Sequence, residues 1–171
     1  MKKNVKFLAL AGILTALSIA LDVVVKQFIP VLNFGLPYYA IPLIIGGILL
    51  GPVYGLLMGL VSDFIGFQLA PNGDYIFLFA LSAMGWGAIP GLFLKSKSSI
   101  ERVVTVLFIT HIIATLSNTG AMFLFGWGEY AMANLPLRLM MLPLNVAILS
   151  FITYYLNQRL QPVYEDFLVS K

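Results

Sequence analysis

Long apolar runs dominate the chain, and proline, glycine, asparagine or grouped charges interrupt them at only a few positions. A membrane helix needs about 20 largely apolar residues to cross about 30 Å of hydrocarbon. The runs therefore predict an all-α membrane protein folded as a six-transmembrane-helix bundle. The six predicted segments are 6–29, 38–50, 52–69, 75–94, 102–125 and 132–158.

The second segment is short for a membrane span. A helix of 13 residues is only about 20 Å long at about 1.5 Å per residue, and Pro42 lies inside this one. We expect this helix to be tilted, kinked or shielded by its neighbours.

Composition supports a membrane protein. The 171 residues are 60% hydrophobic and 10% charged, with a mean hydropathy of +0.96, against roughly 45–50% apolar and 25% charged in soluble domains. No linker-like stretch divides the chain, so a single domain, 1–171, is expected. The first apolar run follows three lysines without a small-residue cleavage site, which favours a retained span over a signal peptide.

Most basic residues fall where six spans place them on one side of the membrane: at either end of the chain or between the fourth and fifth segments. They are Lys2, Lys3, Lys6, Lys95, Lys97, Arg102, Arg159 and Lys171. By the positive-inside rule, both chain ends are then cytoplasmic. The connections 30–37, 68–74 and 126–130 would lie outside, where they could cover an outward-facing pocket.

Small residues form one stripe on the first segment: Ala9, Gly12, Ala16 and Ala20 recur at spacings of three and four. Small side chains let another membrane helix approach closely. The stripe is consistent with packing inside this bundle or with docking onto a separate membrane subunit.

Asp22 and Lys26 lie four residues apart on a nearly opposite face of the same segment, close enough to pair. Charges at this depth are costly unless they are paired, snorkelled or facing water. Both a structural ion pair and a ligand contact remain open.

The fifth segment carries a polar stripe of His111, Thr115 and Asn118, which predicts a face toward the bundle interior. The lone histidine has no accompanying metal-ligand spacing, so no metal site is expected.

Further polar or aromatic pairs share a face in the neighbouring segments: Ser82 with Trp86 in the fourth, and Arg138 with Asn145 in the sixth. They could converge on one cavity or simply form interhelical hydrogen bonds.

Glycines recur along the third segment at Gly55, Gly59 and Gly66, so its backbone is expected to meet a close neighbour. Asp63 lies between the last two, and a carboxylate there is expected to cap backbone groups or bond a neighbouring helix.

Catalytic motifs are missing from the sequence: there is no nucleophile elbow, phosphate-binding Gly-Lys loop or paired-carboxylate motif. The case for an enzyme is therefore poor, although a small membrane-embedded enzyme and a channel-forming subunit are kept as alternatives from two different classes.

Several motifs together resemble one family: ALSIAL in the first segment, the block IPLIIGGILLGPVYGLLMGLVSDFIG at 41–66, LSAMGWG at 81–87, SNTG at 117–120 and LPLRLMMLP at 135–143. The chain resembles the substrate-binding S components of energy-coupling factor (ECF) vitamin transporters, most closely the folate-type branch. The block at 41–66 is the most specific of these motifs.

The resemblance implies a binding subunit in the cell membrane that captures a water-soluble vitamin at its outer face, without a cofactor and without chemistry of its own. It also implies partners: a transmembrane coupling subunit and two cytoplasmic ATPases. The stripe of small residues on the first segment then becomes the docking face for the coupling subunit.

Two departures from the folate-type pattern bear on the substrate. That pattern has arginines where this chain has Lys26 and Trp86, and arginine suits the carboxylates of the glutamyl tail of folate. An indole suits a smaller, less charged heteroaromatic ring such as hydroxymethylpyrimidine or pyridoxine. Folate stays the alternative substrate.

The predicted site has Trp86 stacking on the ring and loop closure burying it. Polar contacts are predicted from Lys26, Asp74, Tyr75, Ser82, Asn118, Glu129, Arg138 and Asn145.

Overall fold

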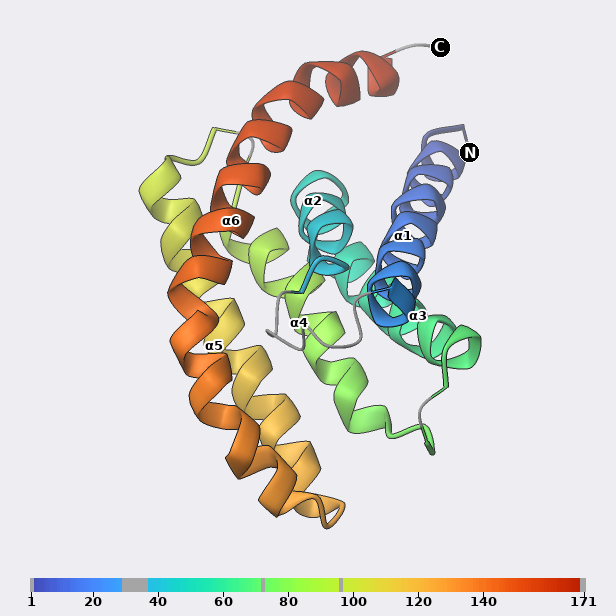
Figure 1. Cartoon of the computed structure of the whole chain (residues 1–171). Helices are drawn as coiled ribbons and strands as arrows, with labels where there is room; N and C mark the ends of the chain where they lie inside the picture. The colour runs from blue at the N-terminus through green and yellow to red at the C-terminus, as the bar shows by residue number, and fades with distance from the viewer. Residues whose placement is uncertain (1, 29–36, 72, 96, 170–171) are drawn as a thin grey trace.

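Six helices and their connections make up the computed structural model (Figure 1), which describes residues 2–28, 37–71, 73–95 and 97–169. Within these residues the secondary structure is entirely helical. The helices are α1 (Lys2–Phe28), α2 (Ala40–Leu50), α3 (Pro52–Leu69), α4 (Phe77–Phe93), α5 (Ile100–Leu124) and α6 (Gly128–Val169). The predicted all-α bundle of six helices is confirmed for the described part of the chain.

Helix α6 differs most from its predicted bounds. It has 42 residues, beginning four residues earlier and ending eleven residues later than the segment 132–158. The apolar run ends near Gln158, where polar side chains begin, but the backbone remains helical beyond it. The hydropathy pattern located the apolar part of the helix and missed its polar extension.

Four helices contain stretches long and apolar enough to cross a membrane: Val5–Gln27, Pro52–Leu69, Ile100–Leu124 and Gly128–Pro162. The apolar helices Ala40–Leu50 and Phe77–Phe93 are shorter than that criterion. The six-span count therefore stays a prediction.

Helix α2 is shielded by its neighbours, as its short length predicted. Eight of its eleven residues are buried, and Figure 1 shows it among α1, α4 and α6. Gly51, whose φ of 99° lies in the left-handed region, separates α2 from α3. Glycine suits this conformation, and Pro52 then begins the next helix at a position where proline is favoured.

Glycines bring the backbones of α2, α3 and α4 into direct contact. A Cβ added at Gly55 would lie 2.5 Å from the carbonyl oxygen of Gly87, and one added at Gly59 would lie 2.6 Å from the carbonyl carbon of Ala83. The predicted close neighbour of the third helix is therefore confirmed, and it is α4. Backbone proximity of this kind fixes the relative position of the three helices.

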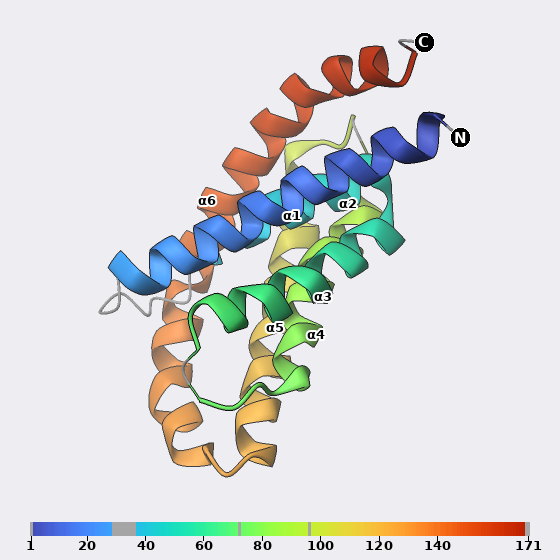
Figure 2. The ribbon, with the colours of Figure 1, turned by 90° about the vertical axis from the view of Figure 1, so that its right-hand side faces the viewer.

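The two ends of the described chain lie at one end of the bundle. Figures 1 and 2 show α1 beginning, and α6 ending, at the same end, while the turn between α5 and α6 lies at the opposite end. This arrangement agrees with termini on one side of a membrane. Their cytoplasmic placement stays a prediction.

Candidate functional site

A cavity of about 190 Å³ opens where the helix ends farthest from the chain termini converge. Its walls come from the last turns of α1, α3 and α5, the start of α4 and the residue preceding α2. The topology predicted from the basic residues puts this end on the outer face. The lining residues are Asp22, Lys26, Tyr39, Ser62, Asp63, Phe79 and Asn118.

The α1 wall of the cavity carries an ion pair. Lys26 Nζ donates to Asp22 Oδ2 at 2.6 Å, which confirms that the two charges pair. The Asp22 side chain is 17% exposed and that of Lys26 is 45% exposed, so Asp22 is the more buried partner of the pair. Gly66 makes room for it, since a Cβ there would lie 3.1 Å from Asp22 Oδ2.

The α3 wall carries a second carboxylate, Asp63, whose Oδ2 accepts a hydrogen bond from the Tyr75 hydroxyl at 3.1 Å. The Tyr75 ring packs against two phenylalanines of α3, with centroid distances of 5.3 Å to Phe64 and 5.2 Å to Phe67. Burial and the Asp63 carboxylate raise the pKa of the Tyr75 hydroxyl to about 12. Tyr75 therefore remains a donor to Asp63 at neutral pH.

Ser62 faces the cavity as a hydrogen-bond acceptor. Ser18 Oγ donates to the carbonyl of Tyr39 at 2.7 Å and lies 2.7 Å from Ser62 Oγ. A hydroxyl has one proton, and that of Ser18 is used on Tyr39, so Ser62 must donate to Ser18. The lone pairs of Ser62 Oγ then remain for a ligand.

Asn118, from α5, completes the polar lining. Its Nδ2 donates to Ser82 Oγ on α4 at 3.4 Å, while its Oδ1 is buried and has no hydrogen-bond partner in the described part of the chain. On another part of the wall the Phe79 ring lies nearly parallel to Trp127, with centroids 6.3 Å apart. The cavity therefore combines an aromatic surface with several oxygen acceptors.

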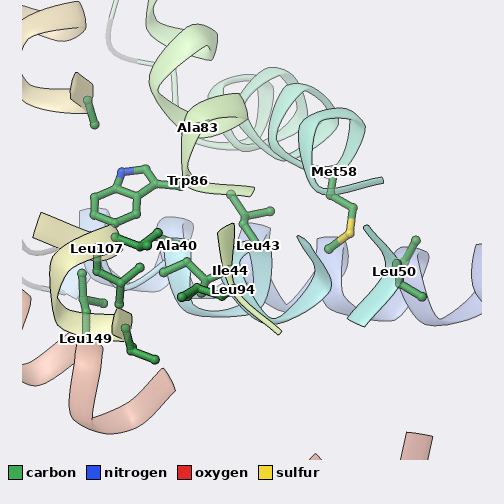
Figure 3. Close-up of a cluster of buried hydrophobic side chains, with 14 residues drawn as sticks. Ala40, Leu43, Ile44, Leu50, Met58, Ala83, Trp86, Leu94, Leu107 and Leu149 are labelled. Atoms are coloured by element: carbon green, nitrogen blue, oxygen red, sulfur yellow. The ribbon is translucent and has the colours of Figure 1, made fainter. Parts of the chain in front are cut away.

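Trp86 lies outside this cavity, in the core shown in Figure 3. Its side chain is 1% exposed, and the figure places it near Leu43 of α2, Leu107 of α5 and Leu149 of α6. In this conformation its indole packs edge-on against His111, with ring centroids 5.4 Å apart. Ligand stacking on Trp86 stays a prediction.

His111 organises a buried polar network beneath the cavity. Its Nδ1 lies 3.3 Å from Thr115 Oγ1, and its Nε2 lies 3.3 Å from Asn145 Nδ2 on α6. The interior face predicted for the polar stripe of α5 is confirmed, since His111 and Thr115 are buried. Among the described residues no three His, Cys, Asp or Glu side chains cluster as metal ligands would.

The residues predicted for the binding site fall into three groups. Lys26 and Asn118 line the cavity, and Tyr75 and Ser82 each bond a lining residue. The others do not line it in this structure: Trp86 and Asn145 are buried beneath it, Asp74 and Glu129 are exposed, and Arg138 is half-buried on α6. Of the three connections predicted to cover the pocket, 30–37 lies, except for Pro37, outside the described residues, and so does residue 72 of the connection 68–74.

Five lining residues were not part of the site predicted from the sequence: Asp22, Tyr39, Ser62, Asp63 and Phe79. For Asp63 the available signal was its position near the outer end of a membrane helix, where an ionisable side chain marks a functional site by default. Tyr39, Ser62 and Phe79 give no such signal, because similar residues occur throughout membrane bundles.

The small residues of α1 face away from the rest of the chain. Ala9, Gly12, Ala16 and Ala20 are all exposed, and a Cβ at Gly12 would have no atom within 4 Å. The opposite face of α1 holds the buried Ser18. The stripe is therefore not used for packing within the described bundle.

Comparison with known proteins found a matching family model and a related protein. Residues 6–157 match the family model described as ECF transporter, substrate-specific component. A folate transporter, FolT, of Clostridium novyi (strain NT) is 30% identical over 107 residues, which are 60% of this chain and 61% of that protein. The match thus spans less than two thirds of the relative. No solved structure matches the chain. Because the family model covers most of the sequence, the chain belongs to the substrate-specific components of ECF transporters.

Proposed function

We propose that the cavity captures a small heteroaromatic vitamin or vitamin precursor, such as hydroxymethylpyrimidine or pyridoxine, from the outer side. Members of this family are substrate-binding subunits of transporters, and the chain is a multi-pass protein of the cell membrane. The observation that carries this proposal is the cavity of about 190 Å³. Sites for drug-sized ligands are usually about 300–1,000 Å³, so this one suits a single substituted ring.

The charges around the cavity also favour a small ring over folate. Its lining holds two carboxylates, Asp22 and Asp63, and one ammonium group, that of Lys26. The segment 29–36 contributes no charged side chain, whatever its position. A net negative lining repels the two carboxylates of a glutamyl tail, because like charges in a desolvated site are costly.

Folate is the second candidate, and a specific observation favours it. The Clostridium novyi relative is named a folate transporter and is 30% identical in the matched region. Lys26 could also hold one carboxylate of the tail if it left Asp22.

A ligand panel on the purified protein tests the proposal. Isothermal titration calorimetry would compare hydroxymethylpyrimidine, pyridoxine and folate at equal concentrations. We expect submicromolar binding of at least one single-ring ligand and binding of folate at least tenfold weaker. Tight folate binding with weak binding of both single rings would overturn the proposed substrate class.

We also propose that the chain works with a transmembrane coupling subunit and two cytoplasmic ATPases, as its family membership implies. The docking face would be the exposed stripe of Ala9, Gly12, Ala16 and Ala20, since small residues permit close helix contact in lipid. ATP hydrolysis would then occur in the partners, and this chain would supply the bound substrate.

A further inference from the structure

The cavity wall formed by α3 and α5 presents an excess of hydrogen-bond acceptors. Asp63 offers a carboxylate of which one oxygen, Oδ2, is engaged by Tyr75. Ser62 has already used its proton on Ser18, and no described residue donates a hydrogen bond to the buried Oδ1 of Asn118. Unpaired buried acceptors are unfavourable, so the lining calls for a ligand that supplies donors.

The one ammonium group in the lining does not cancel this excess. Lys26 Nζ lies 2.6 Å from Asp22 Oδ2, and no other ion pair is found among the described side chains. Asp63 therefore has no cationic side chain within salt-bridge distance in that part of the chain. Its described hydrogen-bond partner is neutral Tyr75.

Tyr75 holds the Asp63 carboxylate in one orientation. Its ring is wedged between Phe64 and Phe67, which come from the same helix as Asp63. A donor fixed on Oδ2 leaves Oδ1 as the oxygen open to another partner. Preorganised acceptors of this kind discriminate strongly against ligands that lack the matching donor.

From these contacts we infer that the cavity selects a ring bearing an exocyclic amino group, with Asp63 as the specificity-determining residue and Tyr75 as its positioning residue. The inference rests on the proposed function and narrows its substrate class to aminopyrimidine-like rings. The two amino hydrogens serve Asp63 and one further acceptor, either Ser62 or Asn118, while the ring faces Phe79. Pyridoxine lacks an exocyclic amino group and is the poorer ligand.

The test pairs two ligands with two variants. The ligands are 4-amino-5-hydroxymethyl-2-methylpyrimidine and the analogue without its amino group; the variants are Asp63→Asn and Tyr75→Phe. Calorimetry of the two ligands on the parent and on one variant gives four dissociation constants for each variant. Matched controls are Glu101→Gln, an exposed acid at the opposite end of the bundle, and Tyr155→Phe, an exposed tyrosine of α6 outside the cavity.

We expect the parent and both controls to prefer the amino ligand by about 10- to 100-fold, the range for a hydrogen bond to a charged group. Asp63→Asn should reduce that preference to less than threefold, and Tyr75→Phe should lower it partially while leaving the affinity for the analogue unchanged. A purely structural role would weaken both ligands equally.

Each outcome has a separate meaning. A parent that prefers the amino ligand, together with an Asp63→Asn variant that keeps the full preference, overturns this inference alone. The pterin ring of folate also carries an exocyclic amino group, so a parent that binds folate tightly and neither pyrimidine overturns the proposed single-ring substrate class. If Asp63→Asn then binds folate as tightly as the parent does, this inference is overturned as well. Loss of the preference in a variant that still binds the analogue like the parent supports both.

Discussion

Replacing Gly87 with alanine tests the packing that holds the cavity walls in place. A Cβ at Gly87 would lie 2.8 Å from the Cα of Gly55, which is 0.6 Å short of the 3.4 Å at which ordinary contact begins, and closer still to the Gly55 carbonyl. The obstacle is backbone, so α3 and α4 must separate. Overpacking of this kind costs about 1–3 kcal/mol.

A second glycine of the same helix supplies the control. A Cβ at Gly85 would meet only Ile89 Cδ1 at 3.8 Å, so Gly85→Ala gains the same helix propensity, about 1 kcal/mol, without the clash. The difference between the two variants then isolates the packing cost. For a domain of this size, about 1–3 kcal/mol corresponds to roughly 2–12 °C in Tm.

Heating each variant in detergent and measuring the monomer that survives by size-exclusion chromatography gives the two Tm values. We expect Gly87→Ala to melt at least 2 °C below Gly85→Ala. It should also bind ligand more weakly, because α3 and α4 carry Asp63 and Phe79. Equal melting temperatures and equal affinities would refute the backbone contact between α3 and α4.

Three further predictions concern the site and its partners. Asp22→Asn should release Lys26 and raise the affinity for folate about three- to tenfold in calorimetry, because the net charge of the lining becomes less negative; unchanged affinity would contradict the charge argument. Ala16→Leu should abolish energised uptake in cells containing the partner subunits while ligand binding persists. Ala147→Leu, on the exposed face of α6, is the control and should leave uptake intact. Uptake by the Ala16→Leu variant would contradict docking on α1. Because the pKa of Tyr75 is raised to about 12, its hydroxyl stays protonated, and the loss of affinity caused by Tyr75→Phe should be constant from pH 7 to about 9.5. The hydroxyl should stop donating only as the pH rises toward 12. If the loss of affinity caused by Tyr75→Phe already becomes smaller at pH 8, the assignment of the proton to Tyr75 is contradicted.

The helices could be predicted from the sequence because hydrophobic periodicity and length are local properties. The bounds of α3 were obtained to the residue, since Gly51 and Pro52 mark its start. The polar end of α6 was missed, because hydropathy identifies only the apolar, membrane-embedded part of a helix, and α6 continues past that part. The glycine spacing predicted that the backbone of α3 meets a close neighbour, but it did not show that this neighbour is α4.

The site was predicted only in part because its residues come from five elements. The Asp22 and Lys26 pair lies on one helix, so spacing alone revealed it. By contrast, the resemblance and shared helix faces drew Trp86 into the predicted site, and nothing in the local sequence shows that its indole packs into the core against His111. Asp63 gained its place in the lining from the register of α3 against α1 and α5, which spacing within one segment cannot supply.

Native mass spectrometry of the protein purified from cells grown in rich medium tests the central claim most directly, because a ligand captured with high affinity is retained through purification. We expect an adduct with the mass of a single-ring amino heterocycle that is lost in Asp63→Asn and kept in Glu101→Gln. An adduct with the mass of folate in the parent protein would contradict the proposed single-ring ligand.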